Sequence, residues 1–557
     1  MSVTDPSAST KRNVVRKLKQ AWGESPFYQA SLRGPAPDRL AFKPSDKRTP
    51  DPSLGEAIVR GRIAVADEVL DCEGEPDRLW DLAAPKPALH AYLNEFSWLR
   101  HLSALGDEGR DTARALTKSW LERYERWSID TWTPFTTAER LTYLCCYSDL
   151  VIKGGDTLWR SRVLASMARQ TRHLAKVAER AGTGYERLMT AFGLTIAALS
   201  LPGCDAPATR GLELLRREMR LQLRPDGGHV SRNASHQLAL VMRLRMVEDA
   251  LCARNHPEPG FIAHALGRAV SFLDLFRCGD GGLAVFNGSY EDDRRALVAA
   301  LNASAPADSP PTGFARYSGY QRLESGRVAM IADVGVTRDG QSNERRDGDG
   351  DKRFQGVGSF HLSSGRSRIV VNCGSAAHLT SAWASAMRGA GAHSVVSGRS
   401  DLSEARILAS PTSSSKRYEN AEGQLLEIER LDAFEGRRFR HLRRFFLASA
   451  GGDLRGQDRL QGCSPHFLTD AVLRFHLHPS VKASRARDGC SILLAIENGE
   501  SWRFRSNCSE LMLDRSVYCG RGGQPVATEQ IVVPLTSLDF ATADDITLKW
   551  AFVRSKT

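Results

Sequence analysis

Three side chains that can hold a carboxylate and move a proton lie within one short turn of the chain, at residues 225–236. Arg232 offers a cation, Asn233 a neutral amide and His236 a titratable imidazole. Together they suit a reaction in which an acidic group is bound and a nearby proton is transferred. A simpler interpretation is that Ser231 or Asn233 only caps the helix that follows.

The turn interrupts a long region in which apolar residues recur at helical spacing, from about residue 87 to residue 301. Short Gly, Pro and Asp signals separate the helical segments, which predicts antiparallel helix hairpins. A run of such hairpins can close into a ring. The predicted helices span residues 89–105, 112–126, 137–152, 159–179, 186–199, 208–223, 235–253 and 260–276.

The pattern changes after residue 313, where short or alternating apolar runs are bounded by turns. Many short strands at such spacing predict a β-sandwich or a jelly roll. A charged, Gly-rich insertion at residues 338–352 is predicted to be a mobile loop. The predicted strands span residues 328–334, 359–362, 368–371, 445–449, 471–476, 491–497, 531–533 and 546–552.

These patterns predict a multi-domain chain in which helices come first and strands second. Residues 1–50 are rich in Pro, Ser, Lys and Arg and are predicted to form a flexible basic arm. Residues 51–312 would form the helical domain, with a strand-like or extended lead-in at residues 54–70, and residues 313–557 the antiparallel β-sandwich. The groove between two packed domains is the default binding site.

Composition narrows the class of partner. The 557 residues are 41% hydrophobic and 25% charged, as in an ordinary globular protein of two to four domains. The formal net charge of +11 favours polyanions as partners. Arginine clusters such as those at residues 437–444 come without a nucleic-acid-binding motif, so no specific nucleic-acid partner is predicted and a solvated face or a polysaccharide track is expected.

The cysteines and the N-terminus point to a compartment. The eleven cysteines are scattered and form no CxxC pair, which argues against a disulfide framework and a zinc site. Residues 1–22 lack the apolar stretch of a secretory signal, and no run of about 18 apolar residues predicts a membrane span. The expected location is the cytoplasm.

From about residue 79 to its end the chain resembles bacterial heparinase II/III-like proteins. This family is related to polysaccharide lyases that join an incomplete (α/α) toroid to an antiparallel β-sandwich. The resemblance rests on short motifs in the same order, among them Asp-Gly-Gly-His-Val-Ser-Arg-Asn and Arg-Phe-His-Leu-His-Pro. The motifs lie at residues 94–100, 169–174, 226–233, 281–287, 359–365, 371–374, 392–394, 460–462 and 474–479.

The resemblance implies β-elimination at a uronic acid of an acidic polysaccharide. In that reaction a neutral donor must neutralise the carboxylate, a base must remove the C5 proton, and an acid must protonate the leaving oxygen. Asn233 matches the neutralising asparagine of the family, while Tyr290 or His236 would transfer protons and His393 would assist. The predicted substrate-binding residues are Arg232, His229 and Trp132.

The chain departs from the family pattern just before the strand predicted at residues 359–362. Active relatives carry a histidine there, whereas this chain has Arg-Phe-Gln-Gly at residues 353–356. His361 lies too far along to replace it, because a slip of one residue moves a strand side chain to the opposite face. A non-catalytic polysaccharide-binding relative is therefore the alternative.

The resemblance adds one alternative for the compartment and one for a metal. Relatives act in the periplasm or cell envelope, so this location stands beside the cytoplasmic expectation. No cofactor is predicted. The segment that helps to hold a structural divalent metal in some relatives is altered here, and the pair His476 and His478 is interpreted as a structural strand motif because no third ligand is near in sequence.

Overall fold

A computed structural model shows two compact units, each built from two segments of the chain. The first unit holds residues 1–222 and 242–264, and the second holds residues 223–241 and 265–557. The predicted domain boundary after residue 312 stays a prediction, although the secondary structure does change near it. The residues that the structure describes are 16–18, 20–65, 68–72, 74–80, 87–257, 259–302, 313–336, 353–399, 407–434, 437–537 and 545–555.

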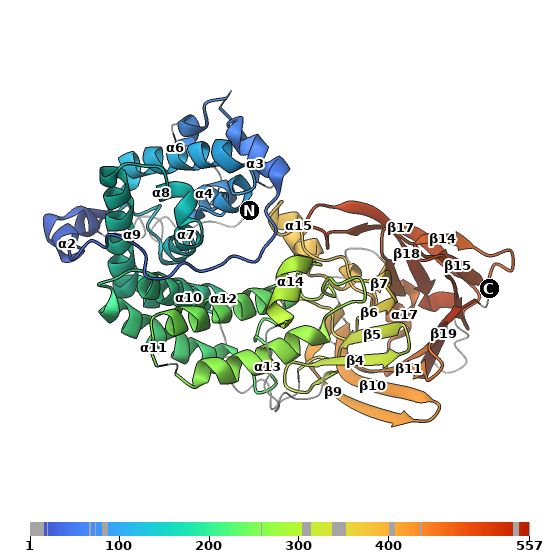
Figure 1. Ribbon diagram of the computed structural model, residues 1–557. Helices are drawn as coiled ribbons and strands as arrows, with labels where there is room; N and C mark the ends of the chain where they lie inside the picture. Colours follow the sequence, from blue (N-terminus) through green and yellow to red (C-terminus); the bar gives the residue numbers. More distant parts are fainter. Residues whose placement is uncertain are drawn as a thin grey trace. The chain divides into compact units, whose positions relative to one another are not determined.

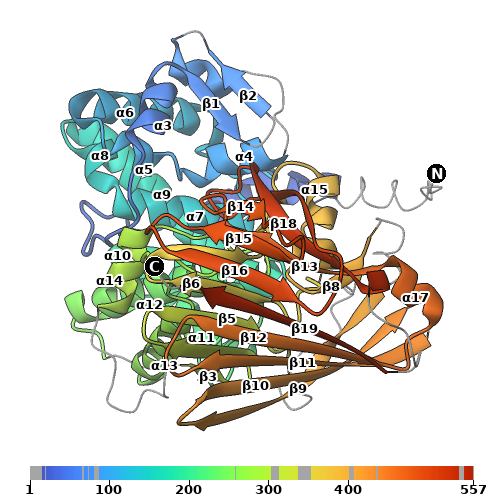
Figure 2. The ribbon, with the colours of Figure 1, turned by 90° about the vertical axis from the view of Figure 1, so that its right-hand side faces the viewer.

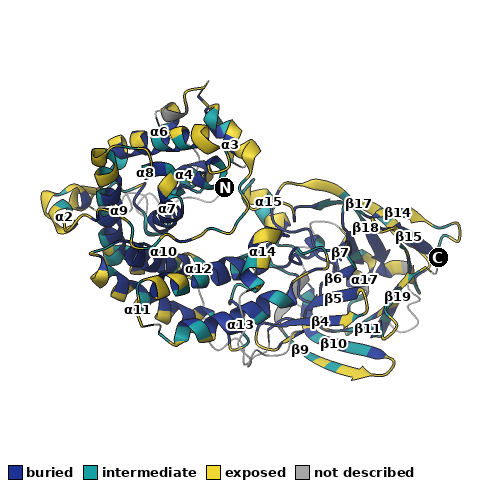
Figure 3. Ribbon diagram, viewed as in Figure 1, coloured by how far each residue is buried: buried dark blue, intermediate teal, exposed yellow. Residues whose placement is uncertain are grey.

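The first unit is mainly helical (Figure 1). Helix α10 (Tyr185–Ser200) is buried along every face from Leu188 to Ser200 (Figure 3), as expected of a helix whose apolar residues surround the axis. It packs against α7 (Pro134–Cys146) and α11 (Asp205–Gln222). The other helices of eight or more residues assigned to this unit are α3 (Pro52–Val59), α4 (Pro87–Glu95), α6 (Gly106–Tyr124) and α9 (Thr157–Val177).

The lead-in to the helical region differs from its prediction. The segment predicted as strand-like begins with helix α3, because Asp51 accepts hydrogen bonds from the backbone N–H groups of Ser53 and Leu54 and Pro52 occupies the first turn. A two-stranded hairpin follows, made of β1 (Arg62–Val65) and β2 (Glu68–Asp71). The capping signal at Asp51 is readable in the sequence, but Gly55 inside the helix obscured it.

The segment before α3 is attached to the first unit. The Tyr28 hydroxyl lies 2.7 Å from Nδ1 of His173 on α9, and Lys176 donates to the hydroxyl of Ser31 at 2.7 Å. The backbone N–H of Ala41 donates to the carbonyl of Ser200. The stretch predicted as a flexible arm is therefore held by these contacts over its described part.

Two of the predicted helices are divided. The first becomes α4 and the short α5 (Leu99–Leu102), because Phe96 adopts a φ of 62° and ends the helical path. The third becomes α7 and α8 (Ser148–Ile152), with Tyr147 between them. Both breaks occur without Gly or Pro at the break, so the apolar spacing did not reveal them.

The second unit contains a sandwich of two antiparallel sheets. The eight-stranded sheet has the order β14-β15-β16-β19-β12-β11-β10-β9 and faces the viewer in Figure 2. The other sheet has the order β17-β18-β13-β7-β6-β5-β4-β3, with β8 paired to β13. The strands are β3 (Phe314–Ala315), β4 (Tyr320–Ser325), β5 (Val328–Asp333), β6 (Phe360–Ser364), β7 (Ser367–Val371), β8 (Val396–Gly398), β9 (Ile407–Asn420), β10 (Gly423–Phe434), β11 (Arg437–Ala448), β12 (Asp453–Gln461), β13 (Ala471–Leu477), β14 (Lys482–Arg485), β15 (Ser491–Ala495), β16 (Ser501–Ser506), β17 (Met512–Tyr518), β18 (Val526–Pro534) and β19 (Asp545–Arg554).

Helices first and antiparallel sheets second confirm the predicted order of α and β structure. Helices α12 (Ala234–Ala253), α13 (Phe261–Leu275) and α14 (Arg294–Leu301) complete the helical region. The predicted loop at residues 338–352 lies outside the described residues. Among the residues placed in the structure, none of the helices has both the length and the apolar character that crossing a bilayer needs. All eleven cysteines are free thiols, and only Cys252 and Cys490 are exposed.

A polar network lies inside the otherwise apolar sandwich core. Asp458 on β12 accepts hydrogen bonds from Nε2 of His441 at 2.7 Å and from Nε1 of Trp550 at 2.8 Å. Arg443 lies 3.4 Å from the same carboxylate. Burial alone would raise the pKa of Asp458, but Arg443 and the hydrogen bonds lower it to about 2.

We predict that Asp458→Asn lowers the free energy of unfolding by about 3 to 5 kcal/mol, because it leaves the buried Arg443 without its anion. Asp453→Asn on the same strand is the matched control, since its partner Arg455 is exposed, and it should cost below about 1 kcal/mol. Urea unfolding followed by circular dichroism measures both.

The same pair of variants tests the direction of the pH dependence. A carboxylate with a depressed pKa stabilises the fold above the unfolded-state pKa of about 3.9, and this stabilisation is lost as the pH falls toward about 2. The difference between the wild type and Asp458→Asn should therefore shrink in acid. A difference that stays constant down to that pH contradicts the role given to the carboxylate.

Candidate functional site

The predicted site begins at the N-terminus of α12, where Asn233 acts as the cap. Its Oδ1 accepts the backbone N–H groups of Ser235 at 2.9 Å and His236 at 3.0 Å. Its Nδ2 donates to the carbonyl of Asn287 at 3.0 Å. The capping interpretation is thus confirmed, and the amide of Asn233, 8% exposed, is bonded to backbone groups at both its oxygen and its nitrogen.

Arg232, predicted to bind substrate, fastens the turn to the first strands of the sandwich. Its backbone has a φ of 56°, and its Nε donates to the carbonyl of Ser318 at 2.9 Å. Its guanidinium also contacts Asp333, the carbonyl of Gly319 and the face of the Tyr320 ring. The cation is therefore paired inside the protein, which is a positioning role and not the predicted contact with a substrate.

His229 and His236 share the hydroxyl of Ser231, at 2.7 Å and 3.0 Å from their Nδ1 atoms. The backbone N–H of Ser231 also donates to Nδ1 of His229, so that atom must be an acceptor and the Ser231 hydroxyl donates to it. Nδ1 of His236 then carries the proton, and its Nε2 keeps the lone pair. Burial lowers the pKa of His229 to about 3 and that of His236 to about 4, so both rings are neutral at pH 7.

Tyr290 lies near this turn, which is the neighbourhood expected of a proton donor. Its backbone N–H donates to the hydroxyl of Ser235 at 3.0 Å, and its phenol hydrogen-bonds with Ser375. Burial raises the pKa of Tyr290, so the phenol keeps its proton at neutral pH. The structure therefore brings Asn233, His236 and Tyr290 to one region of the second unit.

His393 is buried in the sandwich with 2% of its surface exposed. Neither ring nitrogen has a hydrogen-bond partner among the residues that the structure describes, and Phe354 packs edge-on against the ring with centroids 6.1 Å apart. Burial lowers the pKa of His393 to about 4. The imidazole is thus neutral and enclosed, which places it poorly for the predicted role of assisting proton transfer.

Trp132 belongs to the first unit and has 2% of its surface exposed. Its Nε1 donates to the carbonyl of Tyr124 at 3.0 Å, and its ring packs edge-on against His173. The prediction that Trp132 binds substrate conflicts with this geometry, because a ring enclosed by protein cannot stack on a sugar.

The two strand histidines have separate partners. His476 contacts the Ser516 hydroxyl at 2.8 Å, whereas Nε2 of His478 lies 3.2 Å from Glu291. Within the described ranges, no three side chains of His, Cys, Asp or Glu gather in a metal-binding arrangement. These contacts agree with the interpretation of the pair as a structural strand motif.

A basic cavity of about 1000 Å3 opens in the second unit beside the buried His393. Four arginines line it, namely Arg353, Arg388, Arg474 and Arg515, and its described lining includes no carboxylate. Arg474 is held by the hydroxyl of Ser397 at 2.8 Å and the carbonyl of Gly398 at 2.8 Å. We call this space the basic cavity; it suits carboxylate or sulfate groups, which arginine binds through paired N–H donors.

Sequence reasoning missed the basic cavity. Its arginines come from four segments spread over residues 353–515, so no local cluster marks it. Two signals were present: the overall charge of +11, and the place of Arg474 within the family motif at residues 474–479. Arg353 stands in the segment where relatives carry the missing histidine.

Comparison with known proteins gives one end-to-end relative and several solved folds. The chain is 27% identical over 543 residues to FtsZ-localized protein C of Caulobacter vibrioides (strain NA1000 / CB15N), covering 92% of each chain. Crystal structures of heparinase III and of a heparan sulfate lyase HepC mutant from Pedobacter heparinus share its fold. For heparinase III the TM-score is 0.68 at 13% identity, covering 90% of this chain and 84% of that one. For the HepC mutant the TM-score is 0.60 at 13% identity, covering 99% and 90%.

These structural matches confirm the predicted architecture of a toroid followed by a sandwich. The family described as heparinase II/III-like, C-terminal, matches residues 307–551. Residues 307–551 therefore form a domain described as heparinase II/III-like, C-terminal, and the helical part that precedes them shares the architecture of heparinase III.

Proposed function

We propose that this protein binds an acidic polysaccharide or oligosaccharide without cleaving it. The observation that carries the proposal is the engagement of Asn233, whose amide oxygen caps α12 and whose nitrogen is bonded to the carbonyl of Asn287. β-Elimination needs a donor aimed at the sugar carboxylate, and a donor already bonded to backbone is poorly placed for that.

Two further features support loss of catalysis. Residues 353–356 lack the histidine of active relatives, and Arg353 from this segment lines the basic cavity instead. The ring of His393 is enclosed, and its two nitrogens bond to no group in the described part of the chain, so no such hydrogen bond orients the ring for proton transfer. The arginines of the basic cavity can bind an anion, whereas the groups that would transfer protons are missing or enclosed. This combination favours binding over cleavage.

The ligand that the basic cavity suits is an acidic sugar chain. Its four arginines line a space within the usual size range of small-ligand sites, about 300–1000 Å3. Carboxylate and sulfate groups match the planar fork of arginine. The proposed place of binding is therefore the sandwich-side cavity and not the turn at Asn233.

We further propose that the protein acts in the cytoplasm at the place where FtsZ is found. The relative called FtsZ-localized protein C is 27% identical to this chain over 92% of both chains, whereas the two solved lyases are 13% identical to it. Eleven free thiols fit a reducing compartment.

The second candidate function is cleavage of a uronate-containing polysaccharide by β-elimination. It is favoured by the presence of Asn233, His236 and Tyr290 in one region, where the imidazole of His236 is neutral and the phenol of Tyr290 is protonated. These groups are of the types that such a reaction needs.

The first prediction separates the two functions. Incubation with a panel of uronate-containing acidic polysaccharides should produce no ultraviolet-absorbing unsaturated uronate. The reason is that the amide of Asn233 is already bonded to backbone groups and does not neutralise the carboxylate of the sugar. Heparinase III on the same panel is the positive control. A product that appears with the wild type and disappears with Tyr290→Phe, a variant that keeps the ring, would establish the lyase instead.

The second prediction concerns binding. Arg388→Ala with Arg515→Ala should weaken binding of a sulfated oligosaccharide about tenfold, because two cations of the basic cavity are removed. Arg485→Ala with Arg487→Ala, two exposed arginines outside the cavity lining, is the matched control. Equal affinity for both double variants in calorimetry would exclude the basic cavity as the site.

The third prediction concerns location. A fluorescent fusion of the full chain should coincide with labelled FtsZ in dividing cells of the native host. The same pattern is expected for Tyr290→Phe, because location does not depend on proton transfer. A fusion that is diffuse, or that is recovered with the periplasmic fraction, would contradict the proposed place of action.

A further inference from the structure

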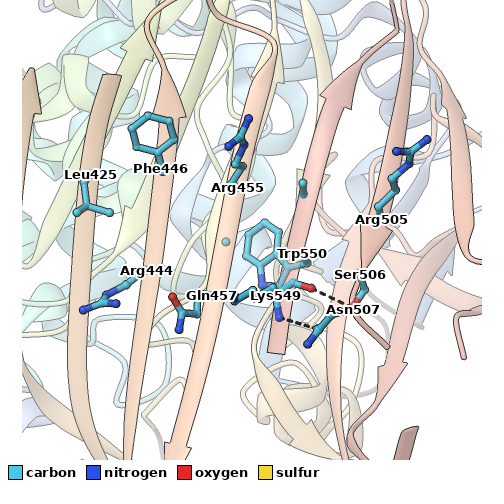
Figure 4. A pocket seen from close by; sticks show the side chains of 12 residues that line it. Leu425, Arg444, Phe446, Arg455, Gln457, Arg505, Ser506, Asn507, Lys549 and Trp550 are labelled. Atoms are coloured by element: carbon cyan, nitrogen blue, oxygen red, sulfur yellow. Dashed lines mark hydrogen bonds between the residues drawn. The ribbon is translucent and has the colours of Figure 1, made fainter. Parts of the chain in front are cut away.

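The outer face of the eight-stranded sheet carries a second hollow of about 420 Å3, built on β10, β11, β12, β16 and β19. It shares no lining residue with the basic cavity. We call it the sheet-face pocket. Its lining includes Leu425, Phe446, Arg444, Arg455, Arg505 and Lys549 (Figure 4).

The register of the strands places one apolar pair beside several cationic side chains. Leu425 pairs with Phe446 across β10 and β11, and the two side chains lie next to each other in Figure 4. Continuing across the sheet, Phe446 pairs with Arg455, Arg455 with Ala551, and Ala551 with Arg505. The neighbouring row carries Arg444 and Lys549, each paired with Gln457 between them.

Gly456 brings the core close to the pocket. A Cβ atom at Gly456 would lie 2.0 Å from the Trp550 ring, so only glycine lets the indole pack against this strand. Trp550 is 3% exposed and is fixed by its hydrogen bond to Asp458. The floor of the pocket is therefore apolar and is formed at a side chain that is buried and held by a hydrogen bond.

The charge around this floor is positive and only partly neutralised. Arg444 is paired with Glu427 at 2.6 Å, and Arg455 with Asp453 at 2.7 Å. Arg505 and Lys549 have no carboxylate partner within the described part of the chain, and none of the lining residues is acidic. Two cations thus remain to attract anionic groups.

We propose that the sheet-face pocket docks an acidic peptide segment of a partner protein, with one apolar side chain placed between carboxylates. Leu425 and Phe446 provide an apolar contact that a leucine or phenylalanine of the peptide would cover. Arg505 and Lys549 then face the flanking carboxylates. An acidic sugar offers the anions but no apolar side chain, and a second copy of a chain with a charge of +11 would be repelled.

The proposal is tested with a fluorescein-labelled synthetic peptide in which one Phe is flanked on each side by three Glu residues. Fluorescence anisotropy with the full chain should show binding that weakens about tenfold in Arg505→Glu with Lys549→Glu. Arg62→Glu with Arg316→Glu is the matched control for net charge, because both residues are exposed and lie outside the pocket lining. No binding to the wild type, or equal loss in both double variants, would overturn the proposal.

The apolar contact has its own test. Replacing the peptide Phe with Ser should weaken binding to the wild type several-fold but change little with Phe446→Ser, since the contact is already absent there. A single-stranded oligonucleotide and a sulfated oligosaccharide of equal charge serve as the other ligands. If either binds the sheet-face pocket as tightly as the peptide, the assignment to an acidic peptide is wrong.

Discussion

The ion pair between Arg232 and Asp333 determines where the candidate site lies. Arg232 sits in the left-handed region at φ 56°, a conformation that costs a non-glycine residue energy unless its surroundings hold it there. The carboxylate of Asp333 and the carbonyls of Ser318 and Gly319 hold it. The carboxylate of Asp226 also accepts hydrogen bonds from the backbone N–H groups of Tyr317 and Ser318. The turn at residues 225–236 is thereby fixed to the start of the sandwich, and the positions of Asn233 and His236 follow.

This attachment gives the residues of the turn a structural role that does not depend on catalysis. Asn233 caps the start of α12, and Arg232 joins the turn before it to the carbonyl of Ser318. Both interactions stabilise the fold without any bound sugar. The presence of the family motif at residues 226–233 is therefore stronger evidence for a shared fold than for a shared reaction. The enclosed His393 and the altered segment at residues 353–356 carry more information about activity.

Much of the architecture was predictable because apolar spacing reports burial. α9 and α10 agree with their predictions to within two residues, as do β5 and β7. The long strands β10 and β12 were missed because their outward faces carry charged residues and their inward faces also carry polar residues, such as Asp432 and Asp458. Of the site, the turn itself was predictable. The pairing of Arg232 with Asp333 and the gathering of the four cavity arginines were not, because these contacts join residues far apart in the chain.

The exposure of the cysteines has a practical consequence. Nine of the eleven thiols are buried, and the two exposed ones fall one in each compact unit, Cys252 in the first and Cys490 in the second. Thiol-reactive dyes would therefore label the unmodified chain once per unit. Energy transfer between a donor at one cysteine and an acceptor at the other would then report the separation of the units in solution, with and without ligand, using a natural pair of handles.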